Sequence, residues 1–365
     1  MASRNRLERK GYRKGYRSGR RYGYHLGRCQ AVTDQQQSRI TAPRNIKVLY
    51  VTSGLGAPYE AIDQSVSAAL KRVVAQAETV LPDEESAMRL EQYRPDLLLT
   101  VHGLNMPEQT LLKARELAVK SALWWADDPY HHDLARQIAP RFDYVFTNEA
   151  NCAEMYRQLG CKHVGYLPLG TDPIAFRPNQ VGPFDFIDIC FIGSAFANRV
   201  AFIDSIASYL AEKKTLISGY WWERLANYEL LKKHIAPHWL GPEETAYCYN
   251  RAKIAVNLHR AHEGLQDLRG EQLAAVSVNP RTFDISACGA LQLTDMRGEL
   301  ANLYIPGEEV ITYATPEEFV EKAEYYLRNE DERYNIAFRG FKRTMSDHTY
   351  DRRIAAMLDA IFGAQ

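Results

Sequence analysis

The sequence predicts an α/β protein with two Rossmann-like domains, each built on a parallel sheet, that face a central cleft. At 365 residues the chain is too long for one ordinary core, and 46% hydrophobic with 11% aromatic content excludes wholesale disorder. From residue 45 onward, apolar strand-like runs alternate with amphipathic helical runs, and a proline-containing break interrupts them once. Because parallel strands need crossover connections, this alternation indicates doubly wound sheets.

The first domain is predicted over residues 45–172. Its opening unit is an apolar strand at 46–52, a glycine loop at 53–58 and an amphipathic helix at 62–77, the beginning of a dinucleotide-type fold. Further strands are expected at 78–81, 96–101, 121–126, 144–147 and 164–167, with helices at 88–93, 111–119 and 152–159.

Residues 173–185 carry three prolines and few strand or helix formers, so they are predicted to be the linker to a second domain at 186–347. The second set of strands is expected at 186–192, 215–218, 252–258 and 290–294, with helices at 200–211, 246–251, 280–288 and 319–327. A C-terminal helix at 350–362, within residues 348–365, is expected to pack back on the N-terminal domain.

Residues 1–44 form a basic arm, with twelve Lys/Arg and two acidic residues, against thirty-three basic and forty-three acidic residues in the remainder. The arm interleaves tyrosine and arginine with a glycine at every fourth position, namely Gly11, Gly15, Gly19, Gly23 and Gly27. Glycine at this density disfavours an isolated helix, so the arm is predicted to be flexible. Three roles stay open: contact with a polyanion, glycan surface or RNA; docking on the acidic body; or a solvated tail.

Composition also bounds the location of the protein. No apolar run approaches a membrane span, and the basic N-terminus lacks the apolar core of a signal peptide, so a cytoplasmic location is expected. The cysteines are scattered without Cys-x-x-Cys spacing and are expected to be reduced and structural: Cys29, Cys152, Cys161, Cys190, Cys248 and Cys288.

The segment 279–295 has the pattern of a phosphate-binding helix start. Asn279 is a suitable N-cap, Pro280 fits the first helical position and Gly289 the helix end. Arg281 can bind phosphate oxygens bidentately, and Asp284, about one turn on, can accept from ribose hydroxyls, so a nucleoside diphosphate fits the group. The alternative interpretation is a capped surface helix with a local Arg281–Asp284 pair.

Several motifs give the chain a likeness to a known family. They are 188–194 with Arg199, 240–242, 252–258, Asn279 to Asp284, Cys288 with Gly289, Asp295, and 306–310. On these residues the chain resembles the two-domain GT-B glycosyltransferases, and specifically the spore-maturation CgeB-type branch with its glycosyltransferase group 1-like C-terminal half. The resemblance covers most of residues 45–362, is strongest at about 186–345 and does not include the basic arm.

The resemblance implies a nucleotide-sugar donor bound by the C-terminal domain and an acceptor bound by the N-terminal domain. Backbone amides at Gly193 and Ser194 would approach the pyrophosphate, and Arg199 with Arg281 would neutralise the leaving diphosphate. In GT-B enzymes protein cations do this work in place of a metal, so no metal and no other cofactor is expected.

For the nucleoside, the resemblance implies a contact between the base and the backbone around Trp239 and Leu240. A UDP-sugar is the expected donor. Related enzymes usually carry glutamate where this chain has Asp284, and the shorter carboxylate can still reach a ribose.

The acceptor side offers residues that follow strands of the first domain. His102 is a candidate for contacting the sugar or taking a proton from the acceptor, although a lone histidine is often structural. Asp127 or Asp128 could be the base of an inverting reaction, or could cap the next helix. Gly54 and Gly56 could admit the acceptor close to the backbone, or could serve a tight turn.

The expected activity is transfer of a sugar from a nucleotide donor to a hydroxyl of a glycan, protein or small-molecule acceptor in a cell-surface or spore-coat glycoconjugate, near the forming spore or envelope. The alternatives are a GT-B nucleotide-sugar epimerase and a non-catalytic glycan- or polyanion-binding protein. A metal-dependent hydrolase is a further alternative, because Asp127, Asp128, His131, His132 and Asp133 are dense in possible ligands. Their spacing matches no strict zinc pattern.

Overall fold

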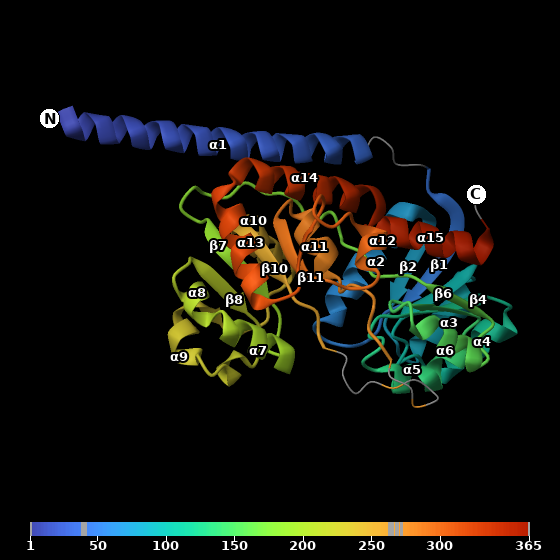
Figure 1. The fold of residues 1–365 in the computed structure, drawn as a ribbon. Coiled ribbons are helices and arrows are strands. Elements are labelled where there is room, and N and C mark those ends of the chain that lie inside the picture. Colours follow the sequence, from blue (N-terminus) through green and yellow to red (C-terminus); the bar gives the residue numbers. More distant parts are fainter. Residues whose placement is uncertain (1, 38–41, 262–265, 267–269, 271–272, 364–365) are drawn as a thin grey trace.

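The computed structural model describes residues 2–37, 42–261, 266, 270 and 273–363, with side chains for residues 12, 13 and 15 onward among them. Two lobes, each built around a six-stranded sheet, lie side by side, and a long helix runs along one of them (Figure 1). Both sheets are parallel throughout, as predicted, so the α/β fold with two Rossmann-like halves is confirmed.

The first sheet holds the strands of the N-terminal half. In spatial order they are β2 (Val74–Val80), β1 (Arg44–Val51), β3 (Leu97–Val101), β4 (Lys120–Trp125), β5 (Tyr144–Thr147) and β6 (His163–Tyr166). One face is covered by α3 (Glu85–Tyr93), α4 (Glu108–Glu116), α5 (His132–Ile138) and α6 (Cys152–Gln158). The other face is covered by α2 (Tyr59–Val73) and α15 (Tyr350–Phe362). Burial of both faces explains why these strands read as continuous apolar runs.

The second sheet holds the strands of the C-terminal half. In spatial order they are β12 (Ile311–Tyr313), β11 (Leu291–Asp295), β10 (Ala252–Asn257), β7 (Ile187–Ile192), β8 (Thr215–Ser218) and β9 (Ile235–Ala236). One face packs on α7 (Ala197–Ser205), α8 (Ala207–Ala211), α9 (Tyr228–Leu231) and α13 (Pro316–Arg328). The other packs on α10 (Pro242–Arg251) and α11 (Arg281–Ala287), with α14 (Glu330–Asp347) outside α11 and α12 (Leu300–Leu303) nearby. Short 3₁₀ turns lie at Ala139–Arg141, Trp222–Arg224 and Lys232–His234.

The strand order of the second sheet locates a binding crevice. Connections from β7 proceed outward to β8 and β9, whereas β10, on the other side of β7, leads outward to β11 and β12. The direction of winding therefore reverses between β7 and β10. Open parallel sheets bind ligands at the carboxyl ends of the strands beside such a reversal, so the loops after β7 and β10 border the expected site.

The chain passes between the lobes again shortly before its C-terminal helix, and the two connections touch. The backbone N–H of Thr171 donates to the carbonyl of His348 at 3.0 Å, and the N–H of Tyr350 donates to the carbonyl of Thr171 at 3.0 Å. A side chain at Gly170 would place its Cβ 2.8 Å from the Tyr350 nitrogen, so the close approach requires glycine there. Residues 45–172 and 186–347 remain our proposed domains.

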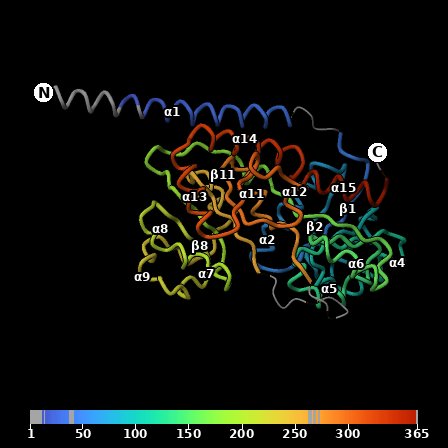
Figure 2. Tube along the Cα trace, viewed as in Figure 1, coloured from blue at the N-terminus to red at the C-terminus, as the bar shows by residue number. Residues whose placement is uncertain are grey.

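The basic arm differs from its prediction. Instead of a flexible segment it is one helix, α1 (Ala2–Gln37), whose second half lies along α14 (Figures 1 and 2). Arg21 pairs with Glu330 at 3.2 Å and Asp331 at 2.5 Å, so among the open alternatives this part docks on the body of the protein. The correction has a physical reason: helix propensity describes an isolated helix, and packing against a partner overrides it.

Deeper contacts also fix α1 in place. The His25 ring bonds the carbonyl of Gly289 at 2.9 Å, and Cys29 is fully buried in a cluster with Ala287 and Phe341. Because Gly289 ends α11 in a left-handed conformation (φ 65°), the prediction of a glycine stop after this helix agrees with the structure. The arm thus contacts the C-terminal end of α11.

One helix boundary was misjudged from the sequence, and one helix was missed. The helix predicted to reach residue 77 ends at Val73, and Val74–Val80 forms β2, which pairs with β1. Pairing with a neighbouring strand overrides the local pattern here. The helix α14, Glu330–Asp347, was not predicted.

Two simple properties complete the description of the fold. All six cysteines are buried free thiols, as expected. Among the residues with described structure, no helix is sufficiently long and apolar to span a bilayer.

Candidate active site

A cavity of about 610 Å³ lies between the two lobes and is lined by residues of both. This volume is in the range of small-molecule sites. The residues predicted from the sequence that line it are Asp127, Asp128, Gly193, Ser194, Arg199, Trp239, Leu240, Asn279, Arg281 and Asp284. Residues that were dispersed over half the chain are therefore gathered at one site.

Two arginines converge on Gly193, the first residue after β7. A Cβ added to Gly193 would lie 3.1 Å from Nη1 of Arg199 and 3.3 Å from Nη1 of Arg281. The φ of 155° at Gly193 also favours glycine. The missing side chain leaves a space that both guanidinium groups face.

The arginine pair has no negative partner within the protein as described. Arg199 is 2% exposed, and its Nε and Nη1 donate to the carbonyls of Leu258 and Ser194, each at 3.0 Å. Neither Arg199 nor Arg281 forms an ion pair with any described residue. Burial, and then the charge of Arg281, lower the pKa of Arg199 well below its ordinary value. A bound anion would relieve both effects.

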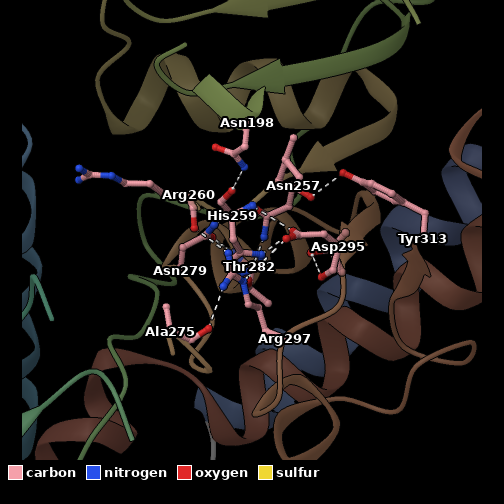
Figure 3. Close-up of polar contacts among 12 residues, drawn as sticks. Asn198, Asn257, His259, Arg260, Ala275, Asn279, Thr282, Asp295, Arg297 and Tyr313 are labelled. Carbon is pink, nitrogen blue, oxygen red and sulfur yellow. Dashed lines mark hydrogen bonds and ion pairs between the residues drawn. The ribbon is translucent and has the colours of Figure 1, made fainter. Parts of the chain in front are cut away.

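A chain of polar side chains fixes the start of α11 (Figure 3). Asn279 donates from Nδ2 to Oδ1 of Asn257 at 2.9 Å, and Asn257 donates from Nδ2 to Oγ1 of Thr282 at 3.0 Å. The hydroxyl of Tyr313 donates to the carbonyl of Asn257 at 3.1 Å. Asn279 also accepts from the Thr282 N–H at 3.3 Å, so it caps the helix although the helix itself begins at Arg281. Arg281 is held against the end of β10 in this way.

Asp284 lies one turn after Arg281 and faces the cavity. The local Arg281–Asp284 ion pair of the alternative interpretation does not form among the described contacts. Burial raises the pKa of Asp284 to about 7, against the opposing charge of Arg281. At this position a carboxyl can exchange hydrogen bonds with ligand hydroxyls in either protonation state.

An Asp–His pair in the same wall was not predicted (Figure 3). Nδ1 of His259 lies 2.5 Å from Oδ1 of Asp295, which also accepts the His259 backbone N–H at 3.0 Å. Nε2 of His259 is buried and has no hydrogen-bond partner, and the residue lines the cavity. A sequence signal existed. His259 follows β10, Asp295 is the last residue of β11, and these neighbouring parallel strands end at the same edge of the sheet.

The electrostatics of this pair define its protonation. Burial lowers the pKa of His259, although Asp295 opposes the shift. Burial alone would raise the pKa of Asp295, but hydrogen bonds from the side chain and backbone of His259, with the charge of Arg297, hold that pKa below its ordinary value. The pair is thus an ionised carboxylate and a neutral imidazole that donates from Nδ1 and leaves Nε2 as an acceptor.

In the first lobe, Asp127 follows β4 and borders the cavity. The hydroxyl of Tyr59 donates to Oδ2 of Asp127, and Nε2 of His102 lies 3.7 Å from the same oxygen. His102 is only 1% exposed, does not line the cavity and is packed between the rings of Tyr59 and Trp125. The sequence placed His102 at the cleft, and the structure places it one layer behind Asp127.

Asp128 is buried beside Asp127. It accepts from Oγ1 of Thr147 at 2.6 Å and from the hydroxyl of Tyr156 at 2.8 Å, while its Oδ1 has no partner. Burial raises its pKa to about 7, against these two hydrogen bonds. A protonated Asp128 could donate from the free oxygen.

Glu149, after β5, was also missed by the sequence analysis. Its carboxylate accepts the backbone N–H groups of Val276 at 3.2 Å and Ser277 at 3.1 Å in the second lobe, and that of Asn151 at 3.2 Å. Glu149 is 1% exposed and lines the cavity. It ties the first-lobe wall of the cavity to the segment that leads into Asn279.

Gly54 and Gly56 lie outside the cavity lining, although Ala57 and Pro58 belong to it. Gly54 has a φ of 65°, and an added Cβ would collide with the Pro82 ring, which matches the tight-turn alternative. A Cβ on Gly56 would meet no atom within 4 Å.

The acidic and histidine-rich stretch near Asp127 does not assemble metal ligands. His132 bonds the Pro129 carbonyl through Nδ1 at 2.7 Å. In the portion of the chain with described structure, no group of three or more His, Cys, Asp or Glu could hold a metal ion.

Two lobes, each with a parallel sheet covered by helices, and a cleft between them define the fold class of the GT-B glycosyltransferases. The solved structures similar to this chain agree. Anabaena HepE bound to UDP-glucose superposes with a TM-score of 0.59 at 10% identity, over 87% of this chain and 100% of that one. Sucrose-phosphate synthase from Thermosynechococcus elongatus gives 0.56 at 12% identity, over 87% and 100%.

A relative in sequence narrows the class. Residues 199–359 match the family described as glycosyl transferase-like. The spore protein CgeB of Bacillus subtilis (strain 168) is 30% identical over 321 residues, which cover 87% of this chain and 98% of CgeB. The chain therefore belongs to the CgeB family.

Proposed function

We propose that this protein is a glycosyltransferase that moves a sugar from a nucleoside diphosphate donor, a UDP-sugar, to a hydroxyl of a cell-surface or spore-coat glycoconjugate. The observation that carries the proposal is the pair of arginines facing Gly193 without a carboxylate partner among the described residues. Diphosphate is an anion of suitable charge, and guanidinium groups bind it bidentately.

The other parts of the cavity fit the remainder of such a donor. Trp239, 42% exposed, and Leu240 offer a surface for the base, and Asp284 offers an acceptor or donor to the ribose. The choice of UDP is supported by the similar fold of HepE, which is bound to UDP-glucose.

In the proposed reaction the acceptor oxygen bonds to the anomeric carbon while the bond from that carbon to the β-phosphate oxygen breaks. The charge that develops on the diphosphate is stabilised by Arg199 and Arg281. The proton of the acceptor hydroxyl passes to Asp127, whose carboxylate is oriented by Tyr59 and backed by His102. Asp128, the next residue, is buried beside this base.

The proposal is tested by a thermal-shift screen of the full-length protein against UDP, GDP, CDP, dTDP and their common sugar conjugates. UDP is expected to raise the melting temperature most. Arg281→Ala should weaken UDP binding about 10- to 100-fold, because it removes a charge-assisted contact. Arg177→Ala is the matched control, since Arg177 is exposed and does not line the cavity. Equal UDP binding by wild type and Arg281→Ala would refute the donor site.

Turnover assays separate the alternative activities. A transferase releases UDP in proportion to an added acceptor, whereas an epimerase converts the donor with no acceptor present, and a binding protein does neither. An epimerase is worth testing because a putative UDP-N-acetylglucosamine 2-epimerase from Listeria monocytogenes shares the fold at a TM-score of 0.54 and 11% identity. The expected metal independence is checked by retained turnover in EDTA.

A further inference from the structure

We propose that His259, oriented by Asp295, binds a hydroxyl group of the transferred sugar and thereby selects the donor. This inference rests on the proposed function, because it assumes a nucleotide sugar in the cavity. It assigns a role to His259, which the sequence motifs did not include, and to Asp295, which they included without a function.

The position of His259 places it beside the transferred group. On one side the carbonyl of Leu258 accepts from Nε of Arg199, at 3.0 Å, so His259 follows the phosphate site directly. On the other side, the carbonyl of Arg260 accepts a hydrogen bond from the Tyr130 hydroxyl at 2.8 Å. The guanidinium of Arg260 lies 4.4 Å from the centre of the Tyr130 ring. Tyr130 belongs to the first lobe. His259 therefore lies between the diphosphate site and the acceptor lobe, where a sugar attached to the β-phosphate must extend.

The hydrogen-bonding state of His259 fits a hydroxyl. Since Nδ1 donates to Asp295, Nε2 carries a lone pair, and it is buried without a partner although the residue lines the cavity. A buried acceptor without a partner is costly, and a ligand O–H would satisfy it. A phosphate oxygen would not, because it is an acceptor itself.

The surroundings hold the imidazole in this state. Asp295 lies between His259 and Arg297, whose Nε is 3.7 Å from its Oδ2, and so keeps its negative charge. Asn198 donates to the carbonyl of His259 at 2.8 Å and fixes the backbone (Figure 3). The geometry is preorganised, which is what a selective polar contact requires.

The first experiment compares the affinities of UDP and its sugar conjugates for wild type and His259→Leu, with UDP-glucose, UDP-galactose and UDP-N-acetylglucosamine as probes. The variant should lose about 10- to 100-fold in affinity for the conjugate that wild type binds best, while UDP affinity changes less than about twofold. His259→Gln, whose amide oxygen can accept in a similar place, should restore part of the loss.

Two results overturn the proposal: an equal loss for UDP and the conjugates, which would make His259 a phosphate contact, and no loss for any conjugate. Failure of the wild type to bind UDP would instead refute the proposed function. Deoxy analogues of the best conjugate sharpen the test. One deoxy position should weaken binding to wild type and have no further effect in His259→Leu.

A second measurement does not depend on the donor, and its main readout uses the wild-type protein. Nitrogen-15 NMR of histidine-labelled wild-type protein near neutral pH should show His259 protonated at Nδ1 and unprotonated at Nε2. Protonation at Nε2 in the free protein would overturn the proposal, because Nε2 could then not accept a hydrogen bond from the sugar. Asp295→Asn should remove the preference for the Nδ1–H form.

Discussion

The two walls of the cleft differ in the charged side chains that form no ion pair with a described residue of opposite charge: two arginines in the second lobe, and carboxyl groups in the first. In the second lobe Arg199 and Arg281 face the cavity without a carboxylate, their geometry set by backbone carbonyls and packing. In the first lobe Asp127, Asp128 and Glu149 line the cavity, and no described lysine or arginine pairs with them. The arginines of one lobe and the carboxyl groups of the other face a shared cavity, and this arrangement fits a ligand that contacts both walls.

The comparison also shows a division of chemical work. The cationic wall suits an anion that must leave, and the acidic wall suits hydroxyl groups that must donate or lose a proton. Each wall can therefore be tested separately, by binding for one and by turnover for the other.

The largest effect is expected from Asp127→Asn, which breaks the acidic wall at the proposed base. Turnover should fall about 10²- to 10⁴-fold, because the amide cannot take a proton, while UDP binding changes little. Steady-state kinetics and the thermal shift with UDP measure the two effects. Asp133→Asn, a change at a 79% exposed side chain on the same segment, is the control. Undiminished turnover in Asp127→Asn would remove it as the base.

Asp128, buried in the same wall, should make the stability of the protein depend on pH. Because its pKa is raised to about 7 from an ordinary 3.8, the native state binds the proton more tightly than the unfolded chain. Stability should therefore be lost as the pH rises from about 4 through about 7, by an amount on the order of a few kcal/mol. Denaturant unfolding at several pH values should show a flatter profile in Asp128→Asn. Parallel profiles for the two proteins would contradict the raised pKa.

Gly193→Ala fills the space that Arg199 and Arg281 face, without removing a charge. The new methyl group would displace the two guanidinium groups and strain a backbone with φ of 155°. UDP affinity should fall roughly tenfold, measured by titration calorimetry. Gly56→Ala is the matched control, since its Cβ would meet nothing within 4 Å. Similar UDP affinities in both variants would show that the space at Gly193 is not the anion site.

The smallest effect is expected where the two walls are joined. Glu149→Gln leaves one oxygen where a carboxylate accepts three backbone N–H groups, and should cost about 1–2 kcal/mol of unfolding free energy. Glu154→Gln, at a 66% exposed position in α6, should cost close to nothing. Denaturant midpoints report both. A cost no larger than that of Glu154→Gln would mean that Glu149 does not hold the lobes together.

The parallel sheets and the cationic wall were predictable because their signals are local. Each predicted strand is a short apolar run, and Gly193, Arg199 and Arg281 lie within a few residues of the strand or helix that positions them. The acidic wall was predicted only in part. His102 follows a strand as expected, but its ring turns into the lobe behind Asp127, and no local pattern reports that rotation.

The residues that were missed depend on distant partners. His259 is oriented by a hydrogen bond to Asp295, 36 positions away, and Glu149 accepts the backbone N–H of Ser277, 128 positions away. The arm was misjudged for the same reason, because the ion pairs of Arg21 lie more than 300 positions along the chain. Spacing within a segment carries no information on such contacts, which only the assembled fold brings together.

The double connection between the lobes has a mechanical consequence. The two connections between the lobes are hydrogen-bonded to each other at Thr171 and Thr349. One connection therefore cannot move without the other. The lobes are therefore expected to move about this double connection, where Gly170 leaves no room for a side chain beside the Tyr350 backbone. Any change in the width of the cleft would therefore have to bend both passages together, at Thr171 and Thr349.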